Sequence, residues 1–213
     1  MTFLHESVLD LDTKYTRSDI EWNFIEGIPS GLTSVAAVGG TATVVDSTNP
    51  AGPALALNIF SSTDAIELRG PLIGRDVVKA VMFNVEGITN SPVSSKPPVW
   101  GVGLYPLSGY ASYIELAHIA SVRSSLSMQN GGGGAKTTVN IMNGTGLTAQ
   151  NYTVGLLANL IDSSAIAHVG HQYGEVLTNA PVVDLYVKIR ATGAVGFETF
   201  TVYIRKITFT MWI

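Results

Sequence analysis

The feature that most constrains the fold of this chain is a two-residue alternation of apolar and polar side chains. From Val183 to Arg190 (VDLYVKIR), aliphatic residues occupy every second position. Successive side chains of a β-strand point to opposite faces, so this pattern predicts a strand with one buried and one solvent-facing side. A similar alternation begins at Phe200 and slips by one residue at Arg205 and Lys206. Because such a slip turns the following side chains over, we expect a β-bulge or a corner between sheets there.

Other segments also have the length and composition of strands, and clusters of Gly, Pro and Asn separate them. The further strands predicted are Ser7–Leu11, Glu21–Ile25, Thr41–Val45, Ala54–Phe60, Ala65–Arg69, Val77–Val85, Val99–Tyr105, Tyr113–Ala120, Ser124–Met128, Thr137–Met142, Val154–Ile161 and Ala165–Val169. Helical periodicity is scarce. The sequence therefore predicts an all-β chain with very little helix, folded as an antiparallel β-sandwich or barrel. We expect a single domain over residues 1–213.

The charge balance excludes several functions. With 12 Lys and Arg against 16 Asp and Glu, the net charge is −4, and the basic excess that nucleic-acid binding requires is lacking. No apolar run approaches the roughly 20 residues of a membrane-spanning helix. The chain has no cysteine, which excludes disulfides, thiolate zinc sites and cysteine nucleophiles. The first ten residues show no secretory leader, so we expect synthesis in the cytoplasm.

The small number of charged residues also indicates contacts with other protein subunits. Charged residues make up 13% of the sequence, about half of the usual ~25%. A monomer with so few charged side chains would have difficulty staying in solution and avoiding edge-to-edge pairing of its strands. We therefore interpret the low charge as surface that contacts other subunits, and we expect a homo-oligomer.

Motifs for catalysis and cofactor binding are weak. The glycine run Gly131–Gly134 lacks the directly following Lys and the helix of a phosphate-binding loop. A Gly-x-Ser-x-Gly motif is absent. His168 and His171 lie in a Gly-containing turn with no further ligand nearby. Asp10 and Asp12 suit either the polar face of an edge strand or a weak calcium site. We therefore predict no enzymatic activity, no catalytic residue, no cofactor and no metal.

An aromatic cluster supplies the residues that are candidates for binding a ligand or forming an interface. They are Trp100, Tyr105, Tyr110 and Tyr113, in a predicted hairpin. Gly101 and Gly103 would share one strand face with Tyr105, and glycines on a strand allow another backbone or a flat ligand to approach closely. The aromatic rings could stack on sugars or anchor a protein interface. The alternative is that Trp100 belongs to the core and the tyrosines lie at the rim.

Two further tryptophans, Trp22 and Trp212, lie near opposite ends of the sequence. The first and last strands of β-sandwiches often pair. We therefore expect the two indoles to pack in the same region of the core, with no ligand implied.

Three segments carry a resemblance to known folds. They are residues 21–24 (EWNF), 54–59 (ALALNI) and 202–210 (VYIRKITFT), with a glycine-rich hairpin region between the first two. This layout resembles a jelly roll of the carbohydrate-binding-module or concanavalin-like kind and covers most of the chain. The resemblance implies the fold and assigns no binding residue.

Cysteine-free, charge-poor folds of this kind also resemble structural proteins of tailed-bacteriophage virions: tail, receptor-binding and head-decorating proteins. A virion subunit cannot rely on disulfides and buries much of its surface against neighbours. The resemblance implies a non-enzymatic virion subunit that contacts copies of itself, in a trimer by analogy, and other virion proteins. Binding of a host surface glycan would be an added activity. The alternatives are a stand-alone carbohydrate-binding module and, third, a polysaccharide-degrading enzyme.

Overall fold

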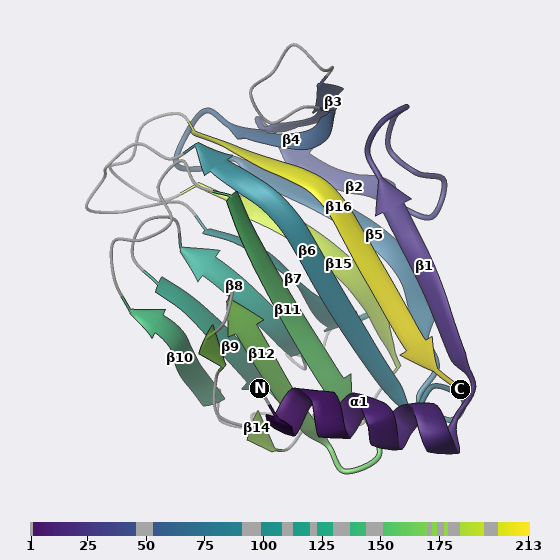
Figure 1. Cartoon of the computed structure of the whole chain (residues 1–213). Coiled ribbons are helices and arrows are strands. Elements are labelled where there is room, and N and C mark those ends of the chain that lie inside the picture. Colours follow the sequence, from purple (N-terminus) through teal and green to yellow (C-terminus); the bar gives the residue numbers. More distant parts are fainter. Residues whose placement is uncertain are drawn as a thin grey trace.

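The chain folds into two stacked antiparallel β-sheets and one α-helix, α1 (Thr2–Lys14) (Figure 1). This all-β antiparallel sandwich with very little helix confirms the fold predicted from the alternation. The computed structural model describes residues 2–45, 53–90, 99–107, 113–119, 123–129, 137–143, 151–169, 172–173, 177–178, 184–193 and 200–213.

The two sheets, A and B, have nine and seven strands in the described ranges. The order in sheet A is β13 (Gln172–Tyr173), β12 (Ser164–Val169), β11 (Asn151–Asn159), β6 (Ala80–Asn90), β16 (Phe200–Trp212), β4 (Ala54–Ile59) and β3 (Thr41–Val45), with β1 (Arg17–Asn23) beside β16 and β14 (Leu177–Thr178) beside β12. The order in sheet B is β10 (Thr137–Asn143), β9 (Arg123–Gln129), β8 (Tyr113–Ile119), β7 (Val99–Pro106), β15 (Leu185–Thr192), β5 (Ala65–Ile73) and β2 (Thr33–Val38). The short strands β13 and β14, and β2, were not predicted.

The main core lies between the two sheets. Alternate residues of each strand point into it, as Leu55 and Leu57 do from β4 and Val187 and Ile189 from β15, and all four are fully buried. Burying one such side chain contributes about 1.5–3 kcal/mol, so this interior accounts for most of the driving force for folding. The single domain over residues 1–213 stays a prediction.

Strand β16 lies inside sheet A and has neighbours on both sides. Residues 200–204 pair with β4 and residues 206–212 pair with β1, while β6 runs along the opposite side (Figure 1). The register with β6 shifts between Ile204 and Lys206, which confirms the predicted bulge. The extra residue, Arg205, is exposed. The bulge therefore lies where the neighbour of β16 on this side changes from β4 to β1.

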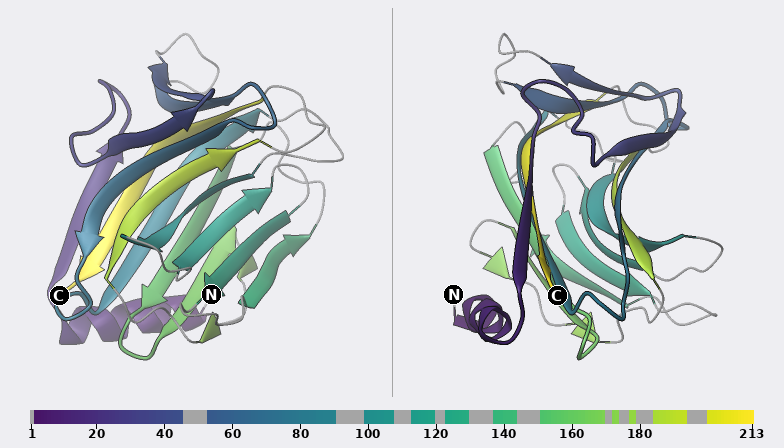
Figure 2. Two further views of the ribbon diagram at one scale, coloured as in Figure 1. Left: turned by 180° about the vertical axis from the view of Figure 1, so that it is seen from behind. Right: turned by 90° about the vertical axis from the view of Figure 1, so that its right-hand side faces the viewer.

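Helix α1 corrects the predicted strand Ser7–Leu11. Val8, Leu11 and Tyr15 are spaced three and four residues apart, so they share one side of the helix. They pack on the outer face of sheet A, against Ala80, Met82, Leu157, Ile166 and Trp212. Figure 2 shows the helix outside this sheet, away from sheet B. The prediction was wrong because the apolar patch that stabilises the helix comes from residues distant in sequence.

None of the helices in the described part of the chain is long and apolar enough to span a membrane.

The two end tryptophans lie on opposite faces of sheet A. Strands β1 and β16 do pair, as expected, with Trp22 opposite Ile207. Trp22 stacks on Phe209 in the main core, with ring centroids 5.7 Å apart. Trp212 points to the other face beneath α1, where its Nε1 donates a 2.8 Å hydrogen bond to Asp12. The expectation that the indoles pack together was therefore wrong, although both side chains are buried.

Asp64 organises the turn between β4 and β5. Its carboxylate accepts hydrogen bonds from the hydroxyl of Ser61 (2.5 Å) and from the amides of Phe60 (2.7 Å) and Ser61 (3.1 Å). These hydrogen bonds, the Ser61 hydroxyl first, hold the pKa of Asp64 below its usual value. Gly39 packs against this carboxylate with a positive φ of 74°, and a Cβ at this position would overlap Asp64.

We expect Gly39→Ala to lower the free energy of unfolding by about 2 kcal/mol, because a left-handed backbone disfavours alanine and the methyl group overlaps Asp64. Urea denaturation followed by tryptophan fluorescence measures the loss. Gly74→Ala is the matched control, since a Cβ there meets no atom within 4 Å. An equal loss of stability in both variants would contradict this explanation.

Candidate functional site

Polar and charged side chains gather on the face of sheet B that points away from the core. On the strands β5, β15, β7, β8 and β9, which lie side by side (Figure 2), these residues alternate with core residues. They are Glu67, Arg69, Tyr105, Tyr113, Glu115, Ser125, Ser127, Tyr186, Lys188 and Arg190. We call this set the polar face of sheet B.

The pair of Glu115 and Arg190 is its most buried part. The guanidinium donates from Nε to one carboxylate oxygen and from Nη2 to the other, at 2.8 Å for Nη2. Glu115 is only 4% exposed. Burial opposes the charge of Arg190, but the hydrogen bonds and charge of Glu115 outweigh it and raise the pKa of Arg190 above its usual value. Both groups are therefore held in one fixed geometry.

Gly101 provides the room for this pair, and Gly103 allows the backbone of β8 to approach closely. A Cβ on Gly101 would lie 2.6 Å from a carboxylate oxygen of Glu115, and a Cβ on Gly103 would overlap the carbonyl oxygen of Ile114. The sequence suggested that these glycines admit another backbone or a flat ligand. In the structure the space above Gly101 holds the side chain of Glu115 instead.

Tyr105 lies between two neighbours on the adjacent strands. Its ring stacks on Tyr113, with centroids 5.5 Å apart and planes at 12°, and the Lys188 ammonium lies 4.2 Å from the ring centroid. Burial, followed by the charge of Glu115, raises the pKa of Tyr105 well above its usual value. The Tyr105 hydroxyl therefore stays protonated at neutral pH, and its ring lies between Lys188 and Tyr113.

Glu67 forms a second ionic cluster beside the first. It accepts hydrogen bonds from Arg69 (2.6 Å), Lys188 (2.9 Å) and the hydroxyl of Tyr186 (3.1 Å). The Arg69 guanidinium also lies over the Tyr186 ring, 4.6 Å from its centroid. Burial alone would raise the pKa of Glu67, but the bonds from Lys188 and Arg69 outweigh it and lower the pKa. Lys188 connects the two clusters, since it contacts both Glu67 and Tyr105.

The structure separates the four aromatic candidates. Tyr105 and Tyr113 lie together on the polar face. Trp100 points into the main core and is 1% exposed, so it lies on the opposite side of sheet B. Tyr110 lies outside the described residues.

The sequence analysis missed the charged residues of this face: Glu67, Arg69, Glu115, Lys188 and Arg190. The alternation does place Lys188 and Arg190 on the polar side of their strand. It does not show which strands are neighbours, and this order is what brings the two carboxylates to them.

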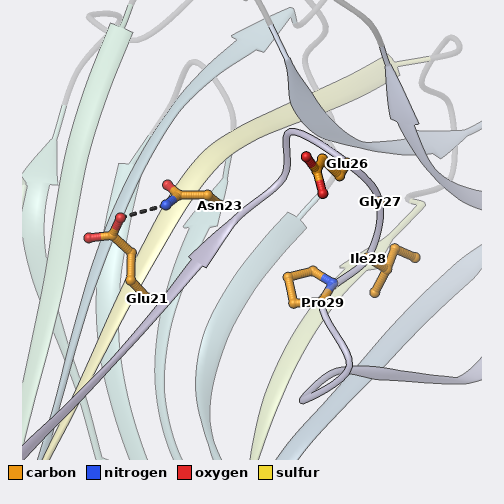
Figure 3. A pocket seen from close by; sticks show the side chains of 6 residues that line it. All are labelled: Glu21, Asn23, Glu26, Gly27, Ile28 and Pro29. Atoms are coloured by element: carbon orange, nitrogen blue, oxygen red, sulfur yellow. Dashed lines mark hydrogen bonds between the residues drawn. The ribbon is translucent and has the colours of Figure 1, made fainter.

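A hollow of about 310 Å³ lies at the end of β1, lined by Glu21, Asn23, Glu26, Gly27, Ile28 and Pro29 (Figure 3). Glu21 accepts a hydrogen bond from Asn23 (2.5 Å) and pairs with Lys206 (2.6 Å). Lys206 holds the pKa of Glu21 below its usual value. The hollow is open, and Glu21 and Asn23 have partners within the protein, so we assign no site to it.

The carboxylates considered for calcium have other partners. Asp10 and Asp12 lie on α1, not on an edge strand. Asp10 pairs with Lys14 at 2.8 Å, and Asp12 accepts the Trp212 hydrogen bond. Among the described residues no three acidic or histidine side chains gather as a metal site. His171 and Gly131–Gly134 lie outside those residues.

Comparison with known proteins identifies the fold type. No protein-family model and no curated protein sequence matches this chain. Arcelin-5, a lectin-like defence protein from Phaseolus vulgaris, superposes with a TM-score of 0.65 at 11% identity, covering 92% of this chain and 98% of arcelin-5. The carbohydrate recognition domain of Emp47p superposes with a TM-score of 0.62 at 12% identity, covering 92% and 95%. The fold is concanavalin-like.

A third similar structure belongs to a protein with a different role. A carbohydrate esterase from the Shiga toxin-encoding bacteriophage phi24B is 15% identical, with a TM-score of 0.60 and coverage of 92% of this chain and 99% of the esterase. Identities this low show the fold alone, since one fold serves many functions. The function of this concanavalin-like chain must be argued from its own side chains.

Proposed function

We propose that this chain is a carbohydrate-binding domain that holds glycans on the polar face of sheet B. The observation that carries the proposal is the stacked pair Tyr105–Tyr113 beside the fixed Glu115–Arg190 pair. A sugar ring has an apolar face that packs on an aromatic ring, and hydroxyls that need donors and acceptors at fixed positions. The Tyr113 ring and the neighbouring charged groups offer both.

The rigidity of this face supports a binding role. Its side chains stand on strands inside a sheet, and ion pairs hold the three long cationic side chains, Arg69, Lys188 and Arg190, in place. Groups that are already ordered lose little conformational entropy when a ligand binds. Such a surface therefore needs little rearrangement to bind a sugar.

The protonation states favour a non-enzymatic role. Glycoside hydrolysis needs a carboxylic acid that can protonate the leaving oxygen. The lowered pKa of Glu67 keeps this carboxylate ionised, so it is a poor proton donor to a leaving oxygen. We propose that the face binds glycans without cleaving them.

A glycan array with matched variants tests the proposal. We expect Tyr113→Ala to weaken the glycan binding of the wild-type chain at least about tenfold, because it removes the stacking ring. Tyr203→Ala is the control, since Tyr203 is similarly half-buried but lies on sheet A. Equal losses in both variants, or a wild-type chain that binds no glycan, would overturn the proposal.

A second candidate is a structural subunit of a bacteriophage virion, acting as a homo-oligomer with neighbouring virion proteins. Its support is the low charge together with exposed apolar side chains: Ile25 is 66% exposed, Val77 57% and Phe60 53%. Such surface suits contacts between subunits. Size-exclusion chromatography with light scattering tests this candidate, and a monomer at micromolar concentration would exclude the homo-oligomer.

A further inference from the structure

We propose that the polar face of sheet B selects acidic glycans, whose sugars carry carboxylates. This inference rests on the proposed function and specifies the ligand class for the same site. Three features of the face carry it: its charge balance, the depth of its charged groups and the geometry of its cations.

The charge balance of the face is opposite to that of the whole chain. Arg69, Lys188 and Arg190 supply three positive charges, while Glu67 and Glu115 supply two negative ones. The described side chains of the face thus have a net charge of 3 − 2 = +1, against −4 for the chain. An anionic polymer is repelled by the chain as a whole and attracted to this face.

The depth of the charged groups strengthens the positive character. In the pair of Glu115 and Arg190, the carboxylate side chain is 5% exposed and the guanidinium side chain 25%. In the pair of Glu67 and Arg69, the corresponding values are 18% and 38%. Both guanidinium side chains are thus more exposed than their carboxylate partners, whereas Lys188 is 15% exposed against 18% for Glu67. A ligand approaching from outside therefore meets the guanidinium groups of Arg69 and Arg190 before the carboxylates.

The kind of cation favours carboxylates. Two of the three groups are guanidiniums, whose planar fork of donors matches a carboxylate and whose hydrogen bonds to anions are about twice as strong as neutral ones. A uronic acid presents a sugar ring and a carboxylate a few ångströms apart. One sugar ring of the polymer would pack on Tyr113, while the carboxylate of a sugar further along the polymer pairs with a guanidinium of the same face, such as that of Arg69, which lies three strands away on β5.

Calorimetric titration with defined polymers tests the inference. Polygalacturonate, its carboxyl-reduced neutral form and dextran sulfate are the probes. We expect polygalacturonate to bind at least about tenfold more tightly than the reduced polymer, and this advantage to shrink as salt is added. Equal binding of the two polymers would overturn the inference and leave the proposed function standing. Equal binding of dextran sulfate would overturn the selection for carboxylates. No binding to these polymers or to any glycan array would overturn both proposals.

Two arginine variants locate the effect. Arg69 and Arg17 are 38% and 39% exposed, and each pairs with a carboxylate two residues away, but Arg17 lies on sheet A. We expect Arg69→Gln to weaken polygalacturonate binding about tenfold and to weaken binding of the neutral polymer much less, because a glutamine amide can still hydrogen-bond a sugar hydroxyl but cannot pair with a carboxylate. Arg17→Gln should change neither. Equal weakening by both variants would overturn the inference, because it would show that only the total charge matters. Thermal melting of both variants verifies that they are folded.

Discussion

Trp100→Ala should lower the free energy of unfolding by about 3–5 kcal/mol, the usual cost of truncating a buried tryptophan. The indole is 1% exposed and among the largest fully buried side chains of the core between the sheets. Removing it loses the buried apolar surface and leaves a cavity. Chemical denaturation of wild type and variant, monitored by circular dichroism, measures the difference.

The matched control is Tyr113→Ala, whose half-buried ring lies on the opposite side of sheet B. Tyr113→Ala should lower the free energy of unfolding by less than half as much as Trp100→Ala, and it should weaken glycan binding instead. The reverse result, in which Trp100→Ala keeps its stability and loses glycan binding, would show that Trp100 contacts the ligand.

The second large effect is expected at the buried ion pair. Arg190→Met should lower the free energy of unfolding by about 3 kcal/mol, because Glu115 would keep a buried charge without its partner. The Glu115 side chain is 5% exposed, so water cannot replace the lost guanidinium. Urea denaturation at neutral pH measures the loss.

Removing the unpaired charge of Glu115 as well distinguishes this cause from a simple loss of packing. The double variant Arg190→Met with Glu115→Gln should regain most of the stability, since no unpaired charge remains. Arg69→Gln is the exposed counterpart and should cost less than about 1 kcal/mol. If the double variant is no more stable than Arg190→Met, the explanation by a buried unpaired charge is wrong.

Local patterns predicted the strands well and the helix poorly. Alternation over eight residues from Val183 indicates a strand whatever surrounds it, and the slip at Arg205 shows the bulge directly. The segment Ser7–Leu11 is short enough to fit either periodicity. Its helical form is stabilised by contacts with Trp212 and Ile166, which no local window contains.

The site was only half predictable for a related reason. Tyr105 and Tyr113 were identified because they are close in sequence, at the two ends of one connection. Arg190 and Lys188 were not, because their carboxylate partners are 75 and 121 residues away in sequence. Their association depends on the order of strands in sheet B, which alternation does not specify.

The position of β16 has a consequence for how the protein folds during synthesis. Residues 200–212 are translated after β1, β4 and β6, yet they pair with all three strands within sheet A. Until β16 leaves the ribosome, the edges of these strands that face it stay unpaired, and Trp22 has no Phe209 to stack on. Because contacts so distant in sequence form slowly, we expect sheet A to assemble only after β16 has been translated. The incomplete chain would then expose unpaired strand edges that are prone to aggregation, so the yield of folded protein would depend on chaperones.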